Sequence, residues 1–93
     1  MNIDLEQIRS GNLIEDVVAE KVPLRRSGAR FVGVEHDSLV VTPQTGFYFW
    51  NSHDEHGDVF DFAGRHLLGY EQRWNSRDPA QFLEAVRYLA QRA

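Results

Sequence analysis

Four aromatic residues in succession, Phe47–Trp50 (FYFW), constrain the fold of this chain more than any other stretch. Side chains of a β-strand alternate between the two faces of its sheet, so two of the four rings point each way. At least two rings must therefore lie on whichever face of the sheet the helices do not cover. The strand is followed by NSHDEH, residues 51–56, where histidines and acids are crowded. Knuckles of this shape usually hold a metal ion through cysteines.

Length and composition limit what this knuckle can be. The chain has 93 residues and no cysteine, which excludes disulfides and thiolate zinc sites. We expect a single domain over residues 1–93, of a size that buries about 60–65% of its unfolded surface. The N-terminus has no basic-then-apolar signal, and no apolar run approaches the ~18 residues of a membrane span. These features favour a soluble, cytoplasmic protein.

The N-terminal part of the chain has the apolar spacing of two short helices. The first is predicted over residues 1–9. The second begins at Asn12, whose side chain is expected to cap it, and ends before Pro23. Its buried face is predicted to comprise Leu13, Ile14, Val17 and Val18.

Residues 24–51 contain the turn residues of β-hairpins. Turns are predicted at Ser27-Gly28, at His36-Asp37 and over residues 43–46. The expected product is a small antiparallel sheet of three or four strands.

Two further helices are predicted after the knuckle. Asp58 is expected to cap a helix over residues 59–68. The last helix has Asp78 as its cap and Pro79 in its first position, with Gln81 completing a capping box. Helices on both sides of a small antiparallel sheet in the sequence indicate an α+β fold.

No arrangement of residues typical of catalysis is present. Ser52 and His53 are neighbours, but adjacent residues of an extended chain point apart. A chain this small also has little room for a buried pocket. We therefore expect no enzymatic activity and no catalytic residues.

Histidines in and near the knuckle are candidates for a metal site. His53 and His56 have H-x-x-H spacing, and His36 is expected to lie nearby across the sheet. Imidazole and carboxylate ligands together suit zinc or another divalent ion. The alternative is a polar turn, because H-x-x-H in a loop has no fixed geometry. His66 falls near the apolar face of its helix and is expected to pack at the edge of the core.

A basic stripe lies within a chain whose net charge is −4. Residues 21–34 contain no acid, and their basic side chains are Lys21, Arg25, Arg26 and Arg30. Phe31 and Tyr48 are expected on neighbouring strands, where bases could stack on exposed rings while arginines hold phosphates. The alternative is a hairpin with solvated arginines and with its aromatic rings buried against helices.

Three segments in a fixed order carry a resemblance to a known family. Residues 24–34, LRRSGARFVGV, match the pattern L-K-K-x-G-x-x-Y-x-G-L. Residues 38–62, SLVVTPQTGFYFWNSHDEHGDVFDF, match S-F-x-V-x-P-x-x-G-F-Y followed by G-D-V-F-x-F, and residues 84–90, EAVRYLA, match E-A-V-x-Y-L-A. These patterns are those of the N-terminal zinc-binding domain of bacterial DnaG-type DNA primases, which this chain resembles over nearly its whole length.

The resemblance implies a zinc-ribbon-like fold that binds single-stranded template DNA beside a separate catalytic domain. The family's zinc ligands, C-P-x-H followed by C-x-x-C, are absent here. The first pair falls on a shortened loop that begins at Glu35, and the second falls on Trp50 and His53. The resemblance therefore implies a degenerate member without a cofactor, in which Trp50 fills the space of a metal ligand and the other knuckle residues form a solvated turn.

The matching hairpin of the family implies a nucleic-acid-binding surface made of Arg25, Arg26, Arg30, Phe31 and Tyr48. The leading hypothesis is a zinc-free module that binds single-stranded DNA in replication, for example that of a mobile element. Primer synthesis is not expected, because the family's catalytic domain is absent from this sequence. One alternative is a protein-interaction domain that docks a helicase, polymerase or other replication protein. Another is a metal-binding module built from the three histidines His36, His53 and His56.

Overall fold

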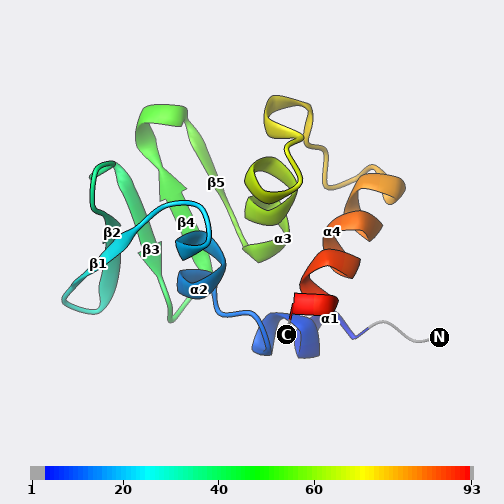
Figure 1. Cartoon of the computed structure of the whole chain (residues 1–93), viewed down its shortest axis with the longest axis horizontal. Coiled ribbons are helices and arrows are strands. Elements are labelled where there is room, and N and C mark those ends of the chain that lie inside the picture. The colour runs from blue at the N-terminus through cyan, green and yellow to red at the C-terminus, as the bar shows by residue number, and fades with distance from the viewer. Residues whose placement is uncertain (1–3, 93) are drawn as a thin grey trace.

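A five-stranded antiparallel sheet with helices on one of its faces forms the fold (Figure 1). This computed structural model describes residues 4–92, so residues 1–3 of the predicted first helix lie outside the described part of the chain. The α+β class is confirmed. The prediction of three or four strands is wrong, because the knuckle itself contributes a fifth strand.

The elements are short except for the last helix. In chain order they are α1 (Leu5–Ser10), α2 (Ile14–Ala19), β1 (Leu24–Ser27), β2 (Arg30–Gly33), β3 (Leu39–Thr42), β4 (Phe47–Trp50), β5 (Glu55–Gly57), α3 (Val59–Phe62) and α4 (Pro79–Arg92). A 3-10 turn at Asn51–His53 precedes β5, a π-helix at Ala63–Leu67 continues α3, and a second 3-10 turn lies at Glu71–Arg73.

Each strand pairs with its neighbours in the sequence, so the sheet is a simple meander in the order β1-β2-β3-β4-β5. The β1–β2 hairpin turns through Gly28, whose φ of 63° favours glycine. Figure 1 shows this hairpin at the end of the molecule farthest from α4. The three arginines of the basic stripe are therefore presented on a projecting hairpin and not among the helices.

The hydrophobic core lies between one face of the sheet and the helices. β3 and β4 direct Leu39, Val41, Tyr48 and Trp50 into the core, and none is more than 5% exposed. α2 packs against β1 and β3, and α3 packs against β5, α2 and α4. The helices contribute the buried side chains of Ile14, Val17, Val18, Val59, Phe60, Phe62, Ala85, Val86 and Leu89. Among residues 4–92, no helix is long and apolar enough to cross a membrane.

The start of α2 differs from the prediction. Asn12 does not cap the helix; the N-cap is Leu13, which makes no side-chain capping bond and is 52% exposed instead of buried. The Asn12 amide is buried and donates to the carbonyls of Ile8 and Leu89 at 2.9 and 3.0 Å, while its oxygen accepts from Arg92 at 2.9 Å. A buried amide with three partners links α1 to α4, and this tertiary role replaces the local capping role.

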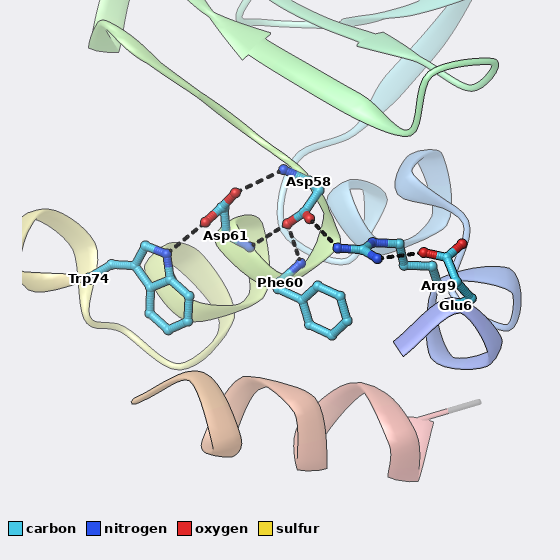
Figure 2. A network of polar contacts seen from close by, with 6 residues as sticks. All are labelled: Glu6, Arg9, Asp58, Phe60, Asp61 and Trp74. Atoms are coloured by element: carbon cyan, nitrogen blue, oxygen red, sulfur yellow. Dashed lines mark hydrogen bonds and ion pairs between the residues drawn. The ribbon is translucent and has the colours of Figure 1, made fainter. Parts of the chain in front are cut away.

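Asp58 caps α3 as predicted, and Figure 2 shows the network around it. Its carboxylate accepts from the backbone N–H groups of Phe60 and Asp61 at 3.0 and 3.1 Å. Asp61 accepts in return from the Asp58 N–H at 3.1 Å, which completes a capping box. The other Asp61 oxygen accepts from the Trp74 indole N–H at 2.9 Å, and Asp58 also accepts from Arg9 at 3.2 Å. The cap of α3 therefore holds α1 and the segment before α4 in place.

The predicted helix over residues 59–68 changes character at Ala63, where it becomes a π-helix. Gly64, in this segment, lies directly against the Trp74 ring. A Cβ atom on Gly64 would be 2.1 Å from Cε3 of that ring, so only glycine allows this approach.

The capping of α4 is confirmed only in part. Asp78 accepts from the N–H groups of Ala80 and Gln81 at 3.0 and 3.3 Å, and Pro79 occupies the first helical position. The predicted capping box does not form, because the Gln81 side chain accepts from the Asn75 N–H at 2.7 Å instead. Gln81 thus holds the loop that precedes α4. Within this loop, the Arg77 N–H donates to the Asn75 side chain at 3.0 Å.

Candidate nucleic-acid interface

The face of the sheet opposite the core carries a continuous row of side chains across all five strands. Arg25 pairs with Val32, Val32 with Val40, Val40 with Phe49, and Phe49 with His56. Residues paired across antiparallel strands project from the same face of the sheet. This row, with the neighbouring Ser27, Arg30, Thr42 and Phe47, is called the open face below.

Two exposed aromatic rings lie on the open face. Phe47 is 45% exposed and Phe49 is 49% exposed. They are two residues apart on β4, which corresponds to about 7 Å along a strand. Phe49 is stacked on the His56 imidazole, with ring centres 5.8 Å apart and planes at 20°. The prediction that two of the four rings lie on the uncovered face is confirmed, and these are the two.

Two arginines share the open face with these rings. Arg25 belongs to the row itself, and Arg30, adjacent to the inward-facing Phe31, points to the same side as Arg25. Both side chains are exposed. Three strand spacings separate Arg25 from Phe49, or about 14 Å. None of the side chains that the described strands direct to this face is acidic.

Arg26 and Phe31 lie on the other side of the same hairpin. They are paired with each other across β1 and β2, and the Arg26 guanidinium carbon is 6.0 Å from the centre of the Phe31 ring. Arg26 also donates through Nε to the Gly28 carbonyl at 3.1 Å. Phe31 is half-buried against the edge of the core. The five residues predicted to form one surface are therefore divided between the two faces of the sheet.

Tyr48 is not on a surface at all. Its side chain is 0% exposed, so no base can reach its ring. The hydroxyl donates to Glu55 at 2.7 Å and accepts from Arg65 at 2.9 Å, and burial raises the pKa of this hydroxyl, as does its bond to Glu55. Tyr48 is therefore a core residue with a satisfied polar end.

Glu55, in β5, is the acceptor at the centre of this buried network. Besides Tyr48, the His66 Nε2 atom lies 2.6 Å from the Glu55 carboxylate, and both side chains are 14% exposed. Burial by itself raises the pKa of a carboxyl, but the hydrogen bonds to His66 and Tyr48 outweigh it and hold the pKa of Glu55 below its ordinary value. His66 packs at the edge of the core as predicted. The prediction of a solvated turn is wrong for Glu55, because β5 turns this side chain inward.

Of the positions that correspond to zinc ligands in the resemblance, Trp50 is buried and His53 packs on it. Trp50 is 5% exposed, and the His53 ring is stacked on it with ring centres 4.0 Å apart and planes at 12°. The rings of His36 and His66 lie 5.5 and 5.4 Å from the indole. Glu35 is exposed in the loop between β2 and β3. The Trp50 Nε1 atom is buried without a hydrogen-bond partner.

The alternative metal site built from three histidines does not form in this arrangement. His36 and His53 pack on Trp50, whereas His56 stacks on Phe49 on the opposite face of the sheet. Within residues 4–92, no three or more His, Cys, Asp or Glu side chains come together in a way that could hold a metal ion.

Phe47 and Phe49 were missed as binding candidates, although the sequence contains the signal for them. Trp50 was expected to be buried, and residues two apart on a strand share a face. Tyr48 must then be buried with Trp50, and Phe47 and Phe49 must point the other way. The alternation of side chains along the strand is therefore sufficient to predict that Phe49, and not Tyr48, is the exposed ring.

No protein-family model and no curated protein matches this sequence. Among solved structures, the fold is similar to the crystal structure of the zinc-binding and RNA polymerase domains of the primase from Aquifex aeolicus, with a TM-score of 0.67 and 21% sequence identity. The match covers 99% of this chain and 22% of that chain, so this chain spans a small part of that protein's length. At this identity the match shows a shared fold, and the predicted primase-like fold is confirmed.

Proposed function

We propose that this protein is a single-stranded nucleic-acid-binding module of primase-related fold that acts in DNA replication by binding and not by catalysis. The observation that carries the proposal is the open face, which carries exposed Phe47 and Phe49 together with Arg25 and Arg30 and to which the described strands direct no acid. An exposed sheet face with aromatic rings is a recurrent platform for single-stranded nucleic acid.

In the proposed mode, bases stack on the rings of β4 and the phosphates lie along the arginines. Phe49, already stacked on His56, presents its exposed part to one base, and Phe47 is placed for the next. Each base–aromatic contact is worth about 1–3 kcal/mol. Arg25 and Arg30 contact phosphates on the open face, and Arg26 adds charge from the other side of the hairpin. Binding should tolerate most sequences, because stacking does not distinguish bases strongly.

The acidic balance of the chain does not place a carboxylate on the open face, because the described strands direct no acid to it. Residues 4–20 contain five acids, Asp4, Glu6, Glu15, Asp16 and Glu20, and one basic residue, Arg9. The hairpin, by contrast, carries only arginines as charged groups. Local charge and not net charge determines where a phosphate backbone binds.

We also propose that the knuckle keeps its shape without zinc. Trp50 occupies the place of a ligand and is packed between histidine rings, and Glu55 ties β5 to the helix beyond α3 through His66. Burial of an indole contributes roughly 2–3 kcal/mol, in part replacing the folding free energy that a structural zinc supplies.

The test is an anisotropy titration of a labelled single-stranded oligonucleotide at several salt concentrations. Phe49→Ala should weaken binding by about 1–3 kcal/mol. Arg25→Ala/Arg30→Ala should weaken binding and reduce the slope of log K against log salt by about 1.4, since each single-strand phosphate contact contributes about 0.7.

The matched control is Arg77→Ala/Arg87→Ala, which removes the same charge from exposed positions outside the sheet. It should change the slope much less than the open-face double variant. Equal effects of the two double variants, or unchanged affinity of Phe49→Ala, would show that the open face is not the binding surface.

A further inference from the structure

A groove of about 360 Å³ lies beside the open face, between the N-terminal helices and the β3–β4 turn. It is called the helix–turn groove here, and its defining residues are Glu6, Arg9, Leu13, Glu15, Phe47 and Asp58. Its size suits one or two side chains and not a nucleic-acid strand.

The groove has exposed apolar walls. Leu13 is 52% exposed on the side of the helices, and Phe47 is 45% exposed on the side of the turn. Leu13 occupies the N-cap position of α2, where leucine is among the least favourable residues and makes no capping bond. The groove is therefore bounded by an exposed apolar side chain on each side.

The charge of the groove is negative. Its lining includes three acidic side chains, Glu6, Glu15 and Asp58, and one basic side chain, Arg9. Arg9 is already engaged, because it donates to Glu6 at 2.9 Å and to Asp58 at 3.2 Å, as Figure 2 shows. Its guanidinium also lies 5.0 Å from the centre of the Phe60 ring. One cation held by two carboxylates leaves the groove with an excess of negative charge.

This chemistry selects the occupant. Phosphates and acidic peptides are repelled by the carboxylates, so the groove does not extend the nucleic-acid path. A basic peptide complements the charge, and a large apolar side chain complements the walls. We propose that the helix–turn groove docks a short basic segment of a partner protein, with one large apolar residue inserted between Leu13 and Phe47. This inference goes beyond the proposed nucleic-acid binding and does not depend on it.

The test begins with selection of displayed short random peptides on the full chain. The selected peptides should carry net positive charge and one large apolar residue. A selected peptide, synthesised with a label, should then bind wild-type protein and lose on the order of tenfold in affinity on Leu13→Ser. Glu15→Gln should weaken binding less, and more at low salt than at high salt.

Leu13→Ser separates binding from folding. Serine is a favourable N-cap, so this variant should unfold at the same or a higher temperature than wild type while it loses the peptide. The matched control is Val34→Ser, which removes an apolar side chain that is 54% exposed and outside the groove, and which should leave peptide binding unchanged.

Several outcomes would overturn the proposal. They are the absence of any enrichment, selected peptides without a positive charge, and equal loss of binding on Leu13→Ser and Val34→Ser. Loss of peptide binding on Arg25→Ala/Arg30→Ala would place the peptide on the open face and reject the groove, because neither arginine lines the groove. Oligonucleotide binding by Leu13→Ser reports on the proposed nucleic-acid function separately, because Leu13 is not on the open face.

Discussion

At the scale of single residues, the interior of the knuckle depends on the Glu55 carboxylate. It accepts from the Tyr48 hydroxyl and lies 2.6 Å from the His66 ring nitrogen. Arg65 donates to the same hydroxyl and to the His56 carbonyl at 2.8 Å, so one network joins β4, β5 and the π-helix. Removing one member leaves buried polar groups without partners, which is more costly than the bond itself.

This network predicts a specific loss of stability in acid. The folded-state pKa of Glu55 lies below its ordinary value, so folding favours the carboxylate. The stabilisation is complete above the unfolded-state pKa of about 4.3 and is lost as pH falls through the lower folded-state value. The free energy of unfolding, measured by denaturant titration at several pH values, should fall below about pH 4.5 in the wild type. In Glu55→Gln this fall should be smaller, because the variant has no carboxylate to protonate at this position.

The control for this effect is Glu35→Gln, which removes an exposed carboxylate from the loop between β2 and β3. It should keep the wild-type pH dependence. If Glu55→Gln also keeps it, the carboxylate is not held in the charged form by the network.

Which aromatic and basic side chains are exposed on the open face is also decided at this scale. Arg25, Arg26 and Arg30 could be read from the sequence as a basic hairpin, but their division between two faces follows from the strand register. Tyr48 and Phe49 have similar aromatic character, and only their parity on β4 separates a core residue from an exposed one.

At the scale of elements, the segment after α3 is held by close backbone packing. Gly64 in the π-helix contacts the buried Trp74, whose indole N–H is bonded to Asp61 in α3. Trp74 thus connects two consecutive turns of one helical segment with the loop that leads to α4.

Gly64→Ala should therefore destabilise the fold. The new Cβ would lie 2.1 Å from the Trp74 ring, and the ring cannot move without loss of its bond to Asp61. We expect a loss of about 1–3 kcal/mol in the free energy of unfolding, measured by denaturant titration. Gly11→Ala is the matched control, because Gly11 is exposed and its φ of −83° is allowed for alanine. Similar losses in the two variants would contradict the role of the Trp74 contact.

Local capping signals at element boundaries correctly predicted two of the four side chains. Asp58 and Asp78 cap their helices as the sequence predicts. Asn12 and Gln81 have equally good local signals, but each makes a bond to a distant or preceding segment instead. A buried carbonyl oxygen without a hydrogen-bond donor is energetically costly. The Asn12 amide donates to the buried Leu89 carbonyl, and this bond takes the place of the capping bond.

At the scale of the whole molecule, the basic open face and the acidic helix–turn groove lie on different parts of the surface. The molecule is elongated, with extents of 39 × 26 × 18 Å, and Figure 1 places the basic hairpin and α4 at opposite ends. Glu6 of α1 and Glu15 of α2 line the helix–turn groove, whereas the described strands direct no acid to the open face. The two proposed ligands therefore differ in charge, and their proposed sites meet at Phe47.

The proposed replacement of zinc is also testable at this scale. The chain has no cysteine, and the side chains of His36, His53 and His56 do not converge. The melting temperature followed by circular dichroism should be the same with added zinc and with a chelator. A rise with zinc that the chelator reverses would contradict a zinc-free knuckle, and His53→Ala would then show whether that residue is a ligand.

The sequence by itself determined the class of this fold and its basic hairpin. Turn residues, helix caps and two-residue alternation act over a few residues, so they can be read without knowledge of distant contacts. Tertiary structure alone decided that the knuckle contributes a fifth strand and that the Glu55 side chain points inward. It decided as well that Asn12 bonds to Leu89 and does not cap α2. It also decided that Leu13 and Phe47 face one groove. These outcomes depend on which buried polar and apolar groups meet across the core, and that pairing is set by segments far apart in the chain.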